Sequence, residues 1–340
     1  MDIKTIKKFI RNIIFFILLI VLTFWIIFKD QDMNQLLNII KSANKSYILL
    51  GFFVMLLSFF CEAYNKKVVL KNFGENISIF RAYKYTMIGF FFSAITPAAT
   101  GGQPMEIYYM SKDKISGAHA TMALLMQLCG YQISTLFLGI FCALLNPSIL
   151  KSGLIFLFLI GVTINGFALT IMLICIFSKR LTKKIVDLFI KILKFFRVKN
   201  LEEKKERLIN GLEKYNNNSN YTKTHKKEFA KSILMIFLQI VLYHSIPFFV
   251  YKSFGLNEYN VFQLFAMQAV LYTTVSGLPL PGAIGISETV FLGIYSKAFG
   301  NGLLQSAMLL NRGISFYIFV IISLTVVIIN IMKNKKIENV

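Results

Sequence analysis

Long apolar runs alternate with short basic stretches along most of this 340-residue chain. A helix needs about 20 residues to cross the hydrocarbon core of a bilayer, and flanking residues bring six of the runs to that length. The six runs are residues 13–28, 47–61, 118–145, 152–177, 232–251 and 303–332. We therefore predict an all-α fold, a polytopic membrane bundle with six full spans in one transmembrane domain covering residues 1–340.

Two further apolar segments, residues 85–110 and 261–299, contain helix breakers near the middle. In the first segment the breakers are Pro97, Gly101 and Gly102, followed by the carboxylate of Glu106. In the second they are Pro279, Pro281, Gly282 and Gly285, followed by the carboxylate of Glu288. The interval from the first proline to the glutamate is nine residues in both. Irregular backbone at this depth is tolerated only where it is buried in protein or lines a wet cavity, so each segment predicts two half-helices that meet at a site.

The basic residues fall mainly in the links between apolar runs, and they predict which links face the cytoplasm. Lys and Arg are concentrated in residues 62–84, 112–114 and 179–231 and in the tail after residue 332. With these links inside, both termini are cytoplasmic, the first broken segment begins and ends inside, and the second begins and ends outside. Two broken, re-entrant helix pairs that enter from opposite faces are typical of an inverted repeat around a midplane site.

The basic loop at residues 179–231 carries a helical pattern of its own. Apolar residues recur at three and four positions, with lysines between them, at Leu181, Ile185, Leu188, Ile192 and Phe195. This pattern predicts either a basic amphipathic helix lying on the inner leaflet or an ordinary surface helix packed on the bundle.

The composition agrees with a membrane protein, since 56% of the residues are hydrophobic and the mean hydropathy is +0.63. A net charge of +21 suggests nucleic-acid binding in a soluble protein, but here the charge lies in the links, where it attracts anionic lipid headgroups. We expect a cell-membrane location, a membrane phospholipid as partner and no direct binding of nucleic acid. The sequence is also compatible with a homo-oligomer.

Four ionisable residues are expected at membrane depth, namely Glu106, His244, Glu288 and Arg312. Such residues are costly in hydrocarbon and usually face a cavity or one another. One interpretation is a phospholipid site, with backbone N–H groups of the breaks and Arg312 on the phosphate and the two glutamates on an amine. Two others stay open: a glutamate carries a proton, or the glutamates only neutralise Arg312. We expect His244 to be a structural, hydrogen-bonded histidine.

Several glutamines lie along the predicted spans, where they either line a hydrophilic groove or bond helix to helix. They are Gln127, Gln132, Gln239, Gln263 and Gln268. No HExxH, P-loop or nucleophile-elbow motif occurs, and the four cysteines do not have metal-type spacing. We therefore expect no catalytic residue, no metal site and no cofactor.

The second broken segment resembles the signature P-x-P-G-G-x-G-x-x-E of the flippase-like, lysylphosphatidylglycerol synthase transmembrane-region family. The matching stretch runs from Pro279 to Glu288, with Ala283 at the usual second glycine. The stretch from Thr96 through Tyr109 is similar to the family's first motif, although Gly-Gly-Gln-Pro-Met-Glu replaces the Arg-x-Gly-Glu of many members. Arg312 resembles the arginine of the family's last span. The likeness covers the chain from its first span to its last.

This resemblance implies a protein that moves phospholipid, notably lysyl- or other aminoacyl-phosphatidylglycerol, between leaflets and so supports resistance to cationic antimicrobial peptides. Longer members carry a cytosolic phosphatidylglycerol lysyltransferase domain, whereas only residues 333–340 follow the last predicted span here. We expect no transferase chemistry from this chain alone. The alternatives are a membrane subunit that acts with a separate aminoacyl-phospholipid synthase, and a transporter of small solutes or ions.

Overall fold

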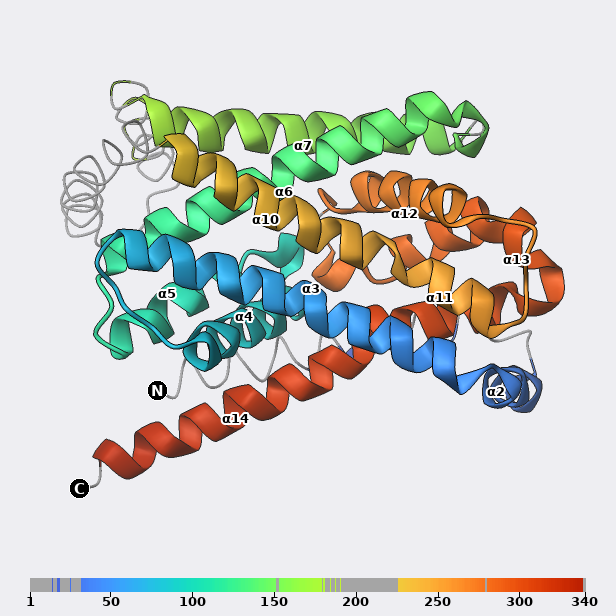
Figure 1. Cartoon of the computed structure of the whole chain (residues 1–340), viewed down its shortest axis with the longest axis horizontal. Helices are drawn as coiled ribbons and strands as arrows, with labels where there is room; N and C mark the ends of the chain where they lie inside the picture. The colour runs from blue at the N-terminus through green and yellow to red at the C-terminus, as the bar shows by residue number, and fades with distance from the viewer. Residues whose placement is uncertain are drawn as a thin grey trace.

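The computed structural model describes residues 32–150, 153–178, 226–278 and 280–338, together with isolated positions within 14–25 and 180–190. All regular elements in these ranges are helical, which confirms the predicted all-α class (Figure 1). The predicted span at residues 13–28 and the predicted amphipathic helix in the 179–231 loop fall almost wholly outside the described residues.

The first half of the chain forms a short helix, a long helix, a broken hairpin and two further long helices. In order, these are α2 (Met33–Ser42), α3 (Lys45–Asn72), α4 (Ile79–Ala94), the 3₁₀ turn η1 (Pro97–Ala99), α5 (Gly102–Lys112), α6 (Gly117–Leu145), the 3₁₀ turn η2 (Pro147–Ile149) and α7 (Leu154–Phe177). We call α4, η1 and α5 the first hairpin.

The second half repeats the order of long helix, broken hairpin and long helix. Its elements are α10 (Lys226–His244), α11 (Ile246–Ser253), α12 (Val261–Val275), the 3₁₀ turn η3 (Pro281–Ala283), α13 (Ile286–Arg312), the π-helical η4 (Gly313–Tyr317) and α14 (Ile318–Glu338). Gly300, with φ of 64° and ψ of 170°, divides α13 into two parts. We call α12, η3 and the first part of α13 the second hairpin.

Five helical segments of the described chain are long and apolar enough to cross a membrane, and they coincide with five of the six predicted spans. They are Lys45–Asn72, Gly117–Leu145, Leu154–Phe177, Lys227–Ser253 and Gly302–Met332. Three helix boundaries were predicted wrongly. Two are the starts of α4 at Ile79 and of α10 at Lys226, which lie inside the predicted loops 62–84 and 179–231. The helix α3 continues to Asn72, so residues 62–72, which we assigned to a cytoplasmic loop, belong to a long helix.

The two hairpins enter the bundle from opposite ends. In Figure 1, α4 and α5 lie at the end where α3 finishes, whereas α12 and α13 lie at the end where α3 begins. Their turns, η1 and η3, contact each other between these ends. Two segments far apart in the sequence are therefore brought together inside the bundle.

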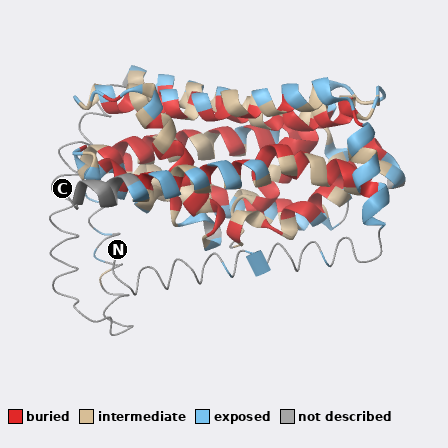
Figure 2. Ribbon diagram, turned by 90° about the horizontal axis from the view of Figure 1, so that it is seen from below, coloured by how far each residue is buried: buried red, intermediate tan, exposed pale blue. Residues whose placement is uncertain are grey.

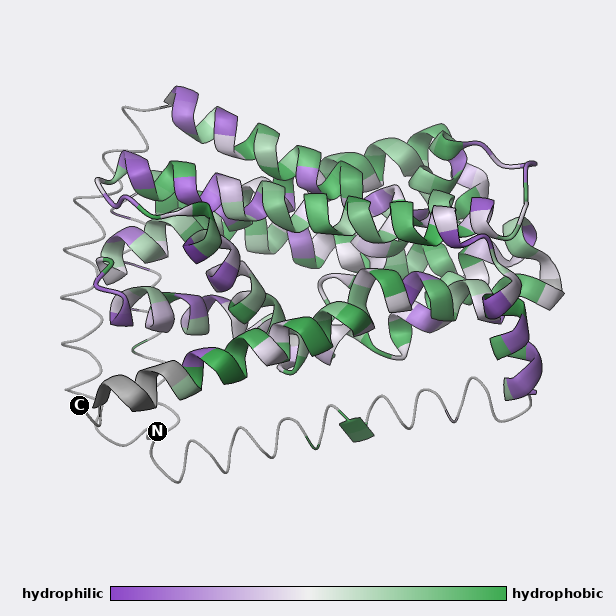
Figure 3. Cartoon of the chain, turned by 60° about the horizontal axis from the view of Figure 1, so that its bottom comes forward, coloured by the Kyte–Doolittle hydropathy of each residue, from purple (hydrophilic) through white to green (hydrophobic). Residues whose placement is uncertain are grey.

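The outer helices expose large apolar side chains, as expected of surfaces that face lipid. Leu144, Phe156, Phe167 and Leu234 are each at least two-thirds exposed. Buried residues face the interior (Figure 2), and hydrophilic residues gather mainly at the two ends of the bundle (Figure 3). This distribution places the apolar band between two polar ends.

Small residues allow α12 to pack closely between α6 and α7. A Cβ atom at Gly139 would lie 2.0 Å from the hydroxyl of Thr273, and one at Gly161 would lie 2.3 Å from the carbonyl oxygen of the same residue. On α7, the buried Asn165 donates from Nδ2 to the Ser276 hydroxyl at 3.0 Å, which fixes the end of α12 beside the break.

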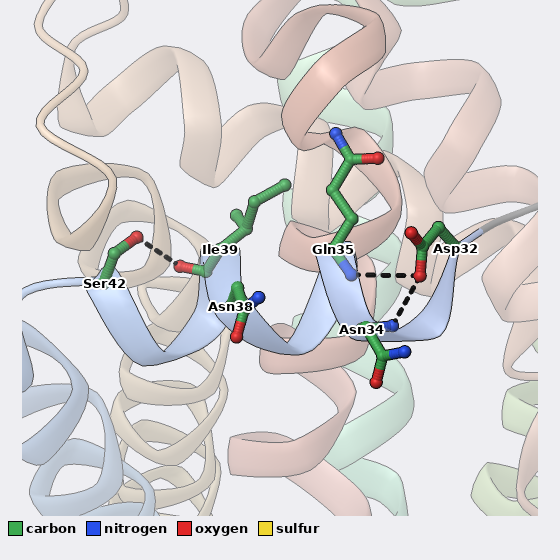
Figure 4. A pocket seen from close by; sticks show the side chains of 6 residues that line it. All are labelled: Asp32, Asn34, Gln35, Asn38, Ile39 and Ser42. Atoms are coloured by element: carbon green, nitrogen blue, oxygen red, sulfur yellow. Dashed lines mark hydrogen bonds between the residues drawn. The ribbon is translucent and has the colours of Figure 1, made fainter.

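The amphipathic helix α2 lies at the end of the bundle where it contacts α13. Asp32 caps its N-terminus by accepting hydrogen bonds from the backbone N–H groups of Asn34, at 2.8 Å, and Gln35, at 3.3 Å (Figure 4). The depression beside these residues is an open, polar surface and is separate from the two hairpin turns.

Candidate functional site

The two hairpin turns share several features of their local geometry. Each begins with a proline, at Pro97 and Pro281, and each is followed by a helix that starts five residues later. The third residue of each turn has a positive φ, 54° at Ala99 and 51° at Ala283. A proline disfavours helix in the residue before it, which explains why both first half-helices end upstream of these turns.

Aligning the two hairpins by these turns pairs different residues from those paired by the equal nine-residue intervals in the sequence. Pro97 corresponds to Pro281, whereas Pro279 lies outside the described residues. Five residues separate the start of each turn from its helix, so the counterpart of Glu288 is Pro104, and Glu106 lies two residues further along α5. The two glutamates are therefore not equivalent by structure.

Glu288 lies in the first turn of α13 and is only 1% exposed. Its Oε2 accepts the backbone N–H of Gly285 at 2.7 Å and the hydroxyl of Ser287 at 2.8 Å. Its Oε1 accepts Nε of Arg312 at 2.8 Å and the hydroxyl of Tyr317 at 3.0 Å. A buried carboxylate with four donors and an ion-pair partner has the environment that such a group requires.

Arg312 ties the last span to the η3 turn. Its Nη2 donates to the carbonyl oxygen of Gly282 at 3.0 Å, and its guanidinium carbon lies 4.3 Å from the ring centroid of Phe316. Gly282 has φ of 58°, and a Cβ atom there would lie 2.4 Å from the Phe316 ring. Both its backbone angles and its close neighbour thus require glycine at this position.

Glu106, in α5, pairs with a lysine that we had assigned to a loop. Its carboxylate is ion-paired and hydrogen-bonded with Nζ of Lys66, which also donates to the Thr86 hydroxyl at 3.1 Å. Lys66 is 1% exposed and Glu106 is 4% exposed. The alternative in which both glutamates neutralise Arg312 is therefore wrong, since of these two only Glu288 is bonded to it.

Glycines allow the first hairpin to close around Glu106. A Cβ atom at Gly89 would lie 2.0 Å from Oε1 of Glu106, and one at Gly102 would lie 2.7 Å from the carbonyl oxygen of Gly89. The N–H of Gly101 donates to the Thr96 hydroxyl at 2.8 Å. The predicted glycines Gly101 and Gly102 thus serve close packing of α5 on α4.

Glu62, one helical turn before Lys66, links three helices. It accepts hydrogen bonds from the amides of Gln127 on α6, at 3.0 Å, and Gln239 on α10, at 2.9 Å. Its Oε1 lies 3.7 Å from Nζ of Lys66. Neither Glu62 nor Lys66 was predicted from the sequence as a site residue. The available signal was the run from residue 52 to 73, which contains neither glycine nor proline and so favours continued helix.

A partly enclosed cavity of about 550 Å³ lies where the two turns meet. Two carboxylates, Glu62 and Glu106, and one cation, Arg312, line this cavity. Gly282 and Ser287 of the second hairpin also line it. The cavity is also lined by polar and aromatic side chains from the surrounding helices, including Gln127, Tyr131, Gln132, Tyr243, Gln268, Tyr272 and Asn311. Of the other predicted glutamines, Gln239 bonds to Glu62 and Gln263 caps α12.

His244 does not have the hydrogen bonds that we expected. It is fully buried, and neither ring nitrogen has a hydrogen-bond partner among the described residues. Its ring packs within 5.8 Å of the centroids of Tyr243, Phe265 and Tyr272. The histidine is therefore part of an aromatic cluster behind the cavity.

The far end of the first hairpin is held by a carboxylate outside the spans. Asp113 accepts Nζ of Lys84 and the hydroxyl of Tyr85, both at 2.6 Å, which joins the end of α5 to α4. Burial raises the pKa of Asp113, but the hydrogen bonds from Lys84 and Tyr85 and the nearby Arg81 outweigh it and hold the pKa below its ordinary value. This anchor keeps the two half-helices together.

Comparison with known proteins agrees with this architecture. The family model described as "Lysylphosphatidylglycerol synthase TM region" matches residues 12–323. A UPF0104 membrane protein of Archaeoglobus fulgidus is 23% identical over 337 residues, which cover 92% of this chain and 95% of that protein. With the five long apolar helices, these likenesses show a multi-pass membrane protein.

Proposed function

Since the chain belongs to the lysylphosphatidylglycerol synthase transmembrane-region family, we propose that it moves phospholipid, with aminoacyl-phosphatidylglycerol as the substrate class, between membrane leaflets. The observation that carries this proposal is the cavity where the turns of the two hairpins meet. The family places the protein in lipid handling at the membrane, and transport between leaflets is our extension of that role.

A polar headgroup cannot cross hydrocarbon at low cost, because each unsatisfied polar group costs several kcal/mol there. This cavity offers a charged acceptor, a charged donor and several amides inside an apolar bundle. The hairpins enter from opposite ends, so a small movement of either one opens the cavity toward a different leaflet. The acyl chains remain in the surrounding lipid while the headgroup passes.

We place the protein in the cell membrane with both termini in the cytoplasm. The end of the bundle at which α3 and α5 finish carries Lys71, Lys112 and Lys114, and it is the end from which the 179–231 loop departs. Positive charge of this kind marks the cytoplasmic side. In this orientation, movement of a cationic lipid outward lowers the negative charge of the outer surface and favours resistance to cationic antimicrobial peptides.

A second candidate follows from the family description, which names a synthase. In this case the chain is the membrane subunit of a phosphatidylglycerol lysyltransferase and works with a separate synthase that supplies the catalytic domain. Lysyl transfer that requires both proteins would support this candidate.

A flipping assay in proteoliposomes tests the first proposal. Fluorescent phosphatidylglycerol and its lysylated form are compared for the wild type and for the Glu288→Gln and Arg312→Ala variants. We expect faster movement of the lysylated lipid with the wild type and loss of that movement in both variants. If the purified chain moves neither lipid above the rate of empty liposomes, the proposal fails and the partner-dependent candidate takes its place.

A further inference from the structure

The described part of the cavity carries an excess of negative charge. Its lining includes Glu62, Glu106 and Arg312. Behind them, Lys66 pairs with Glu106 and Glu288 pairs with Arg312. These five residues comprise three carboxylates and two cations, so one negative charge remains without a full partner.

The geometry assigns this charge to Glu62. Lys66 is hydrogen-bonded to Glu106, whereas its Nζ lies 3.7 Å from Oε1 of Glu62. The side chain of Glu62 is 16% exposed, compared with 5% for Glu106 and 0% for Lys66. Both carboxylates line the cavity, and the one with the weaker contact to the lysine is thus also the more exposed.

Three tyrosines from different helices, Tyr131, Tyr243 and Tyr272, line the same cavity as Glu62. The ring of Tyr272 lies 6.0 Å from that of Tyr131, at 72°, and 5.5 Å from that of Tyr243, at 73°. The hydroxyl groups of Tyr131 and Tyr272 are hydrogen-bonded to each other, and Tyr131 lies one helical turn after Gln127, which donates to Glu62. Nearly perpendicular rings form a corner, and ring faces attract ammonium groups.

Two buried amide oxygens in this region have no hydrogen-bond partner among the described residues. They are Oε1 of Gln127 and Oε1 of Gln132, and both residues line the cavity. Nε2 of Gln127 already donates to Glu62, so its unpaired oxygen lies close to the carboxylate that shares Lys66 with Glu106. Buried acceptors normally have a donor, and an ammonium group has three N–H donors to offer.

We propose that Glu62, Gln127 and the corner of Tyr131, Tyr243 and Tyr272 form a subsite for an alkylammonium group. This subsite rests on the proposed function, because it takes the ammonium group to be part of a lipid headgroup. Both cations at this part of the cavity are already ion-paired, so the subsite selects a cationic headgroup over an anionic one. A free organic amine has the same chemistry, and the test below distinguishes the two sources.

Equilibrium binding to the full-length purified chain tests this subsite without requiring transport. The probes are a short-chain, water-soluble lysyl-phosphatidylglycerol, the same lipid with both lysyl amines acetylated, and lysine methyl ester as a free amine. Each is titrated into the wild type, Glu62→Gln, Tyr272→Leu and Tyr272→Phe. Glu258→Gln, which removes an exposed carboxylate outside the cavity lining, is the matched control.

We expect the wild type to bind the lysyl lipid at least about tenfold more tightly than the acetylated lipid. Glu62→Gln and Tyr272→Leu remove this preference, whereas Tyr272→Phe, which keeps the ring, and Glu258→Gln retain it. Binding of the acetylated lipid is the same in all variants and reports that each is folded. Preference for the lipid over lysine methyl ester identifies the headgroup as the source, and equal binding identifies a free amine.

Equal affinity of the wild type for the lysyl and acetylated lipids would overturn the subsite, as would an unchanged preference in Glu62→Gln. Selective binding without flipping would leave the subsite standing and defeat the proposed transport. Flipping without selective binding would overturn the subsite and leave the proposed transport standing.

Discussion

Lys66 of α3 forms a buried ion pair with Glu106 of α5, a residue forty positions later in the sequence. On the other side of the cavity, Arg312 forms an ion pair with Glu288. Each hairpin is therefore tied by one carboxylate to a cation on a long helical segment. In the proposed transport, a hairpin that moves to open the cavity changes the surroundings of one of these pairs.

Replacing Lys66 with Met leaves Glu106 buried without its cation. We expect a loss of stability of about 3–5 kcal/mol, as for other buried pairs that lose one partner. Thermal unfolding in detergent measures this loss. The double variant Lys66→Met/Glu106→Gln should recover much of the stability, because no isolated charge remains. Lys67→Met is the control, and a similar loss there would contradict the interpretation.

The geometry at Arg312 requires a guanidinium. Its Nε bonds to Glu288 while its Nη2 bonds to the carbonyl of Gly282, and a single ammonium group does not reproduce this planar, two-sided arrangement. Arg312→Lys should therefore keep the fold but slow lipid movement at least about tenfold, since about 1.4 kcal/mol corresponds to one such factor. If Arg312→Lys moved lipid as fast as the wild type, a positive charge at this position would be sufficient for transport.

Gly89 provides the space that Glu106 occupies. In Gly89→Ala, the new methyl group would lie 2.0 Å from Oε1 of Glu106, so the carboxylate must move away from Lys66. We expect lower thermal stability and slower transport. Gly166→Ala in α7 is a matched control, because no neighbouring atom lies within 4 Å of its new Cβ. Equal behaviour of the two variants would argue against close packing at Gly89.

A hydrogen-bonded carboxylate in the loop after α3, that of Glu75, is expected to make the protein less stable in acid. The backbone N–H of Ser116 and the ring of His119 donate to Glu75 and hold the pKa of its carboxyl below the ordinary 4.5. Glu75 therefore contributes stability fully above pH 4.5, and this contribution is lost as the pH falls through the lower folded-state pKa. The melting-temperature difference between wild type and Glu75→Gln should shrink in this acid range. A constant difference would show that this carboxyl does not contribute.

Because the hairpins enter from opposite ends of the bundle, we expect residues 112 and 301 to lie on opposite sides of the membrane. Single cysteines placed at residue 112, after the first hairpin, and at residue 301, after the second, should be labelled by impermeant reagents from opposite sides of the membrane. We expect position 112 to react only from the cytoplasmic side. Labelling of both from one side would rule out the inverted arrangement.

The sequence was most informative where backbone chemistry is restrictive. Prolines and glycines inside apolar runs identified both turns, because a proline such as Pro281 lacks the N–H that a helix needs and a glycine such as Gly282 readily takes a positive φ. The sequence could not supply the register of the hairpins. Equal spacing favoured Pro279 as the counterpart of Pro97, whereas the positions of the 3₁₀ turns favour Pro281.

From the sequence, Glu62 and Lys66 of α3 were also assigned to the wrong environment. Lys66 lies beside Lys67 and near Lys71, a grouping typical of a cytoplasmic loop. Only the fold shows that α3 continues and that Lys66 faces Glu106 from within the bundle. Burial of a lysine depends on a partner distant in the sequence, and local patterns do not contain that partner.

In the proposed transport a headgroup passes through the cavity between the hairpins, and blocking the cavity tests this directly. In a Cys175→Ser background, Ala168→Cys places a thiol on α7 at the cavity lining, and Gly166→Cys places one on the same helix outside that lining. Flipping of lysyl-phosphatidylglycerol in proteoliposomes is measured before and after reaction with a bulky methanethiosulfonate. We predict that modification at residue 168 stops transport and that modification at residue 166 does not. Undiminished transport with residue 168 fully modified would contradict the account.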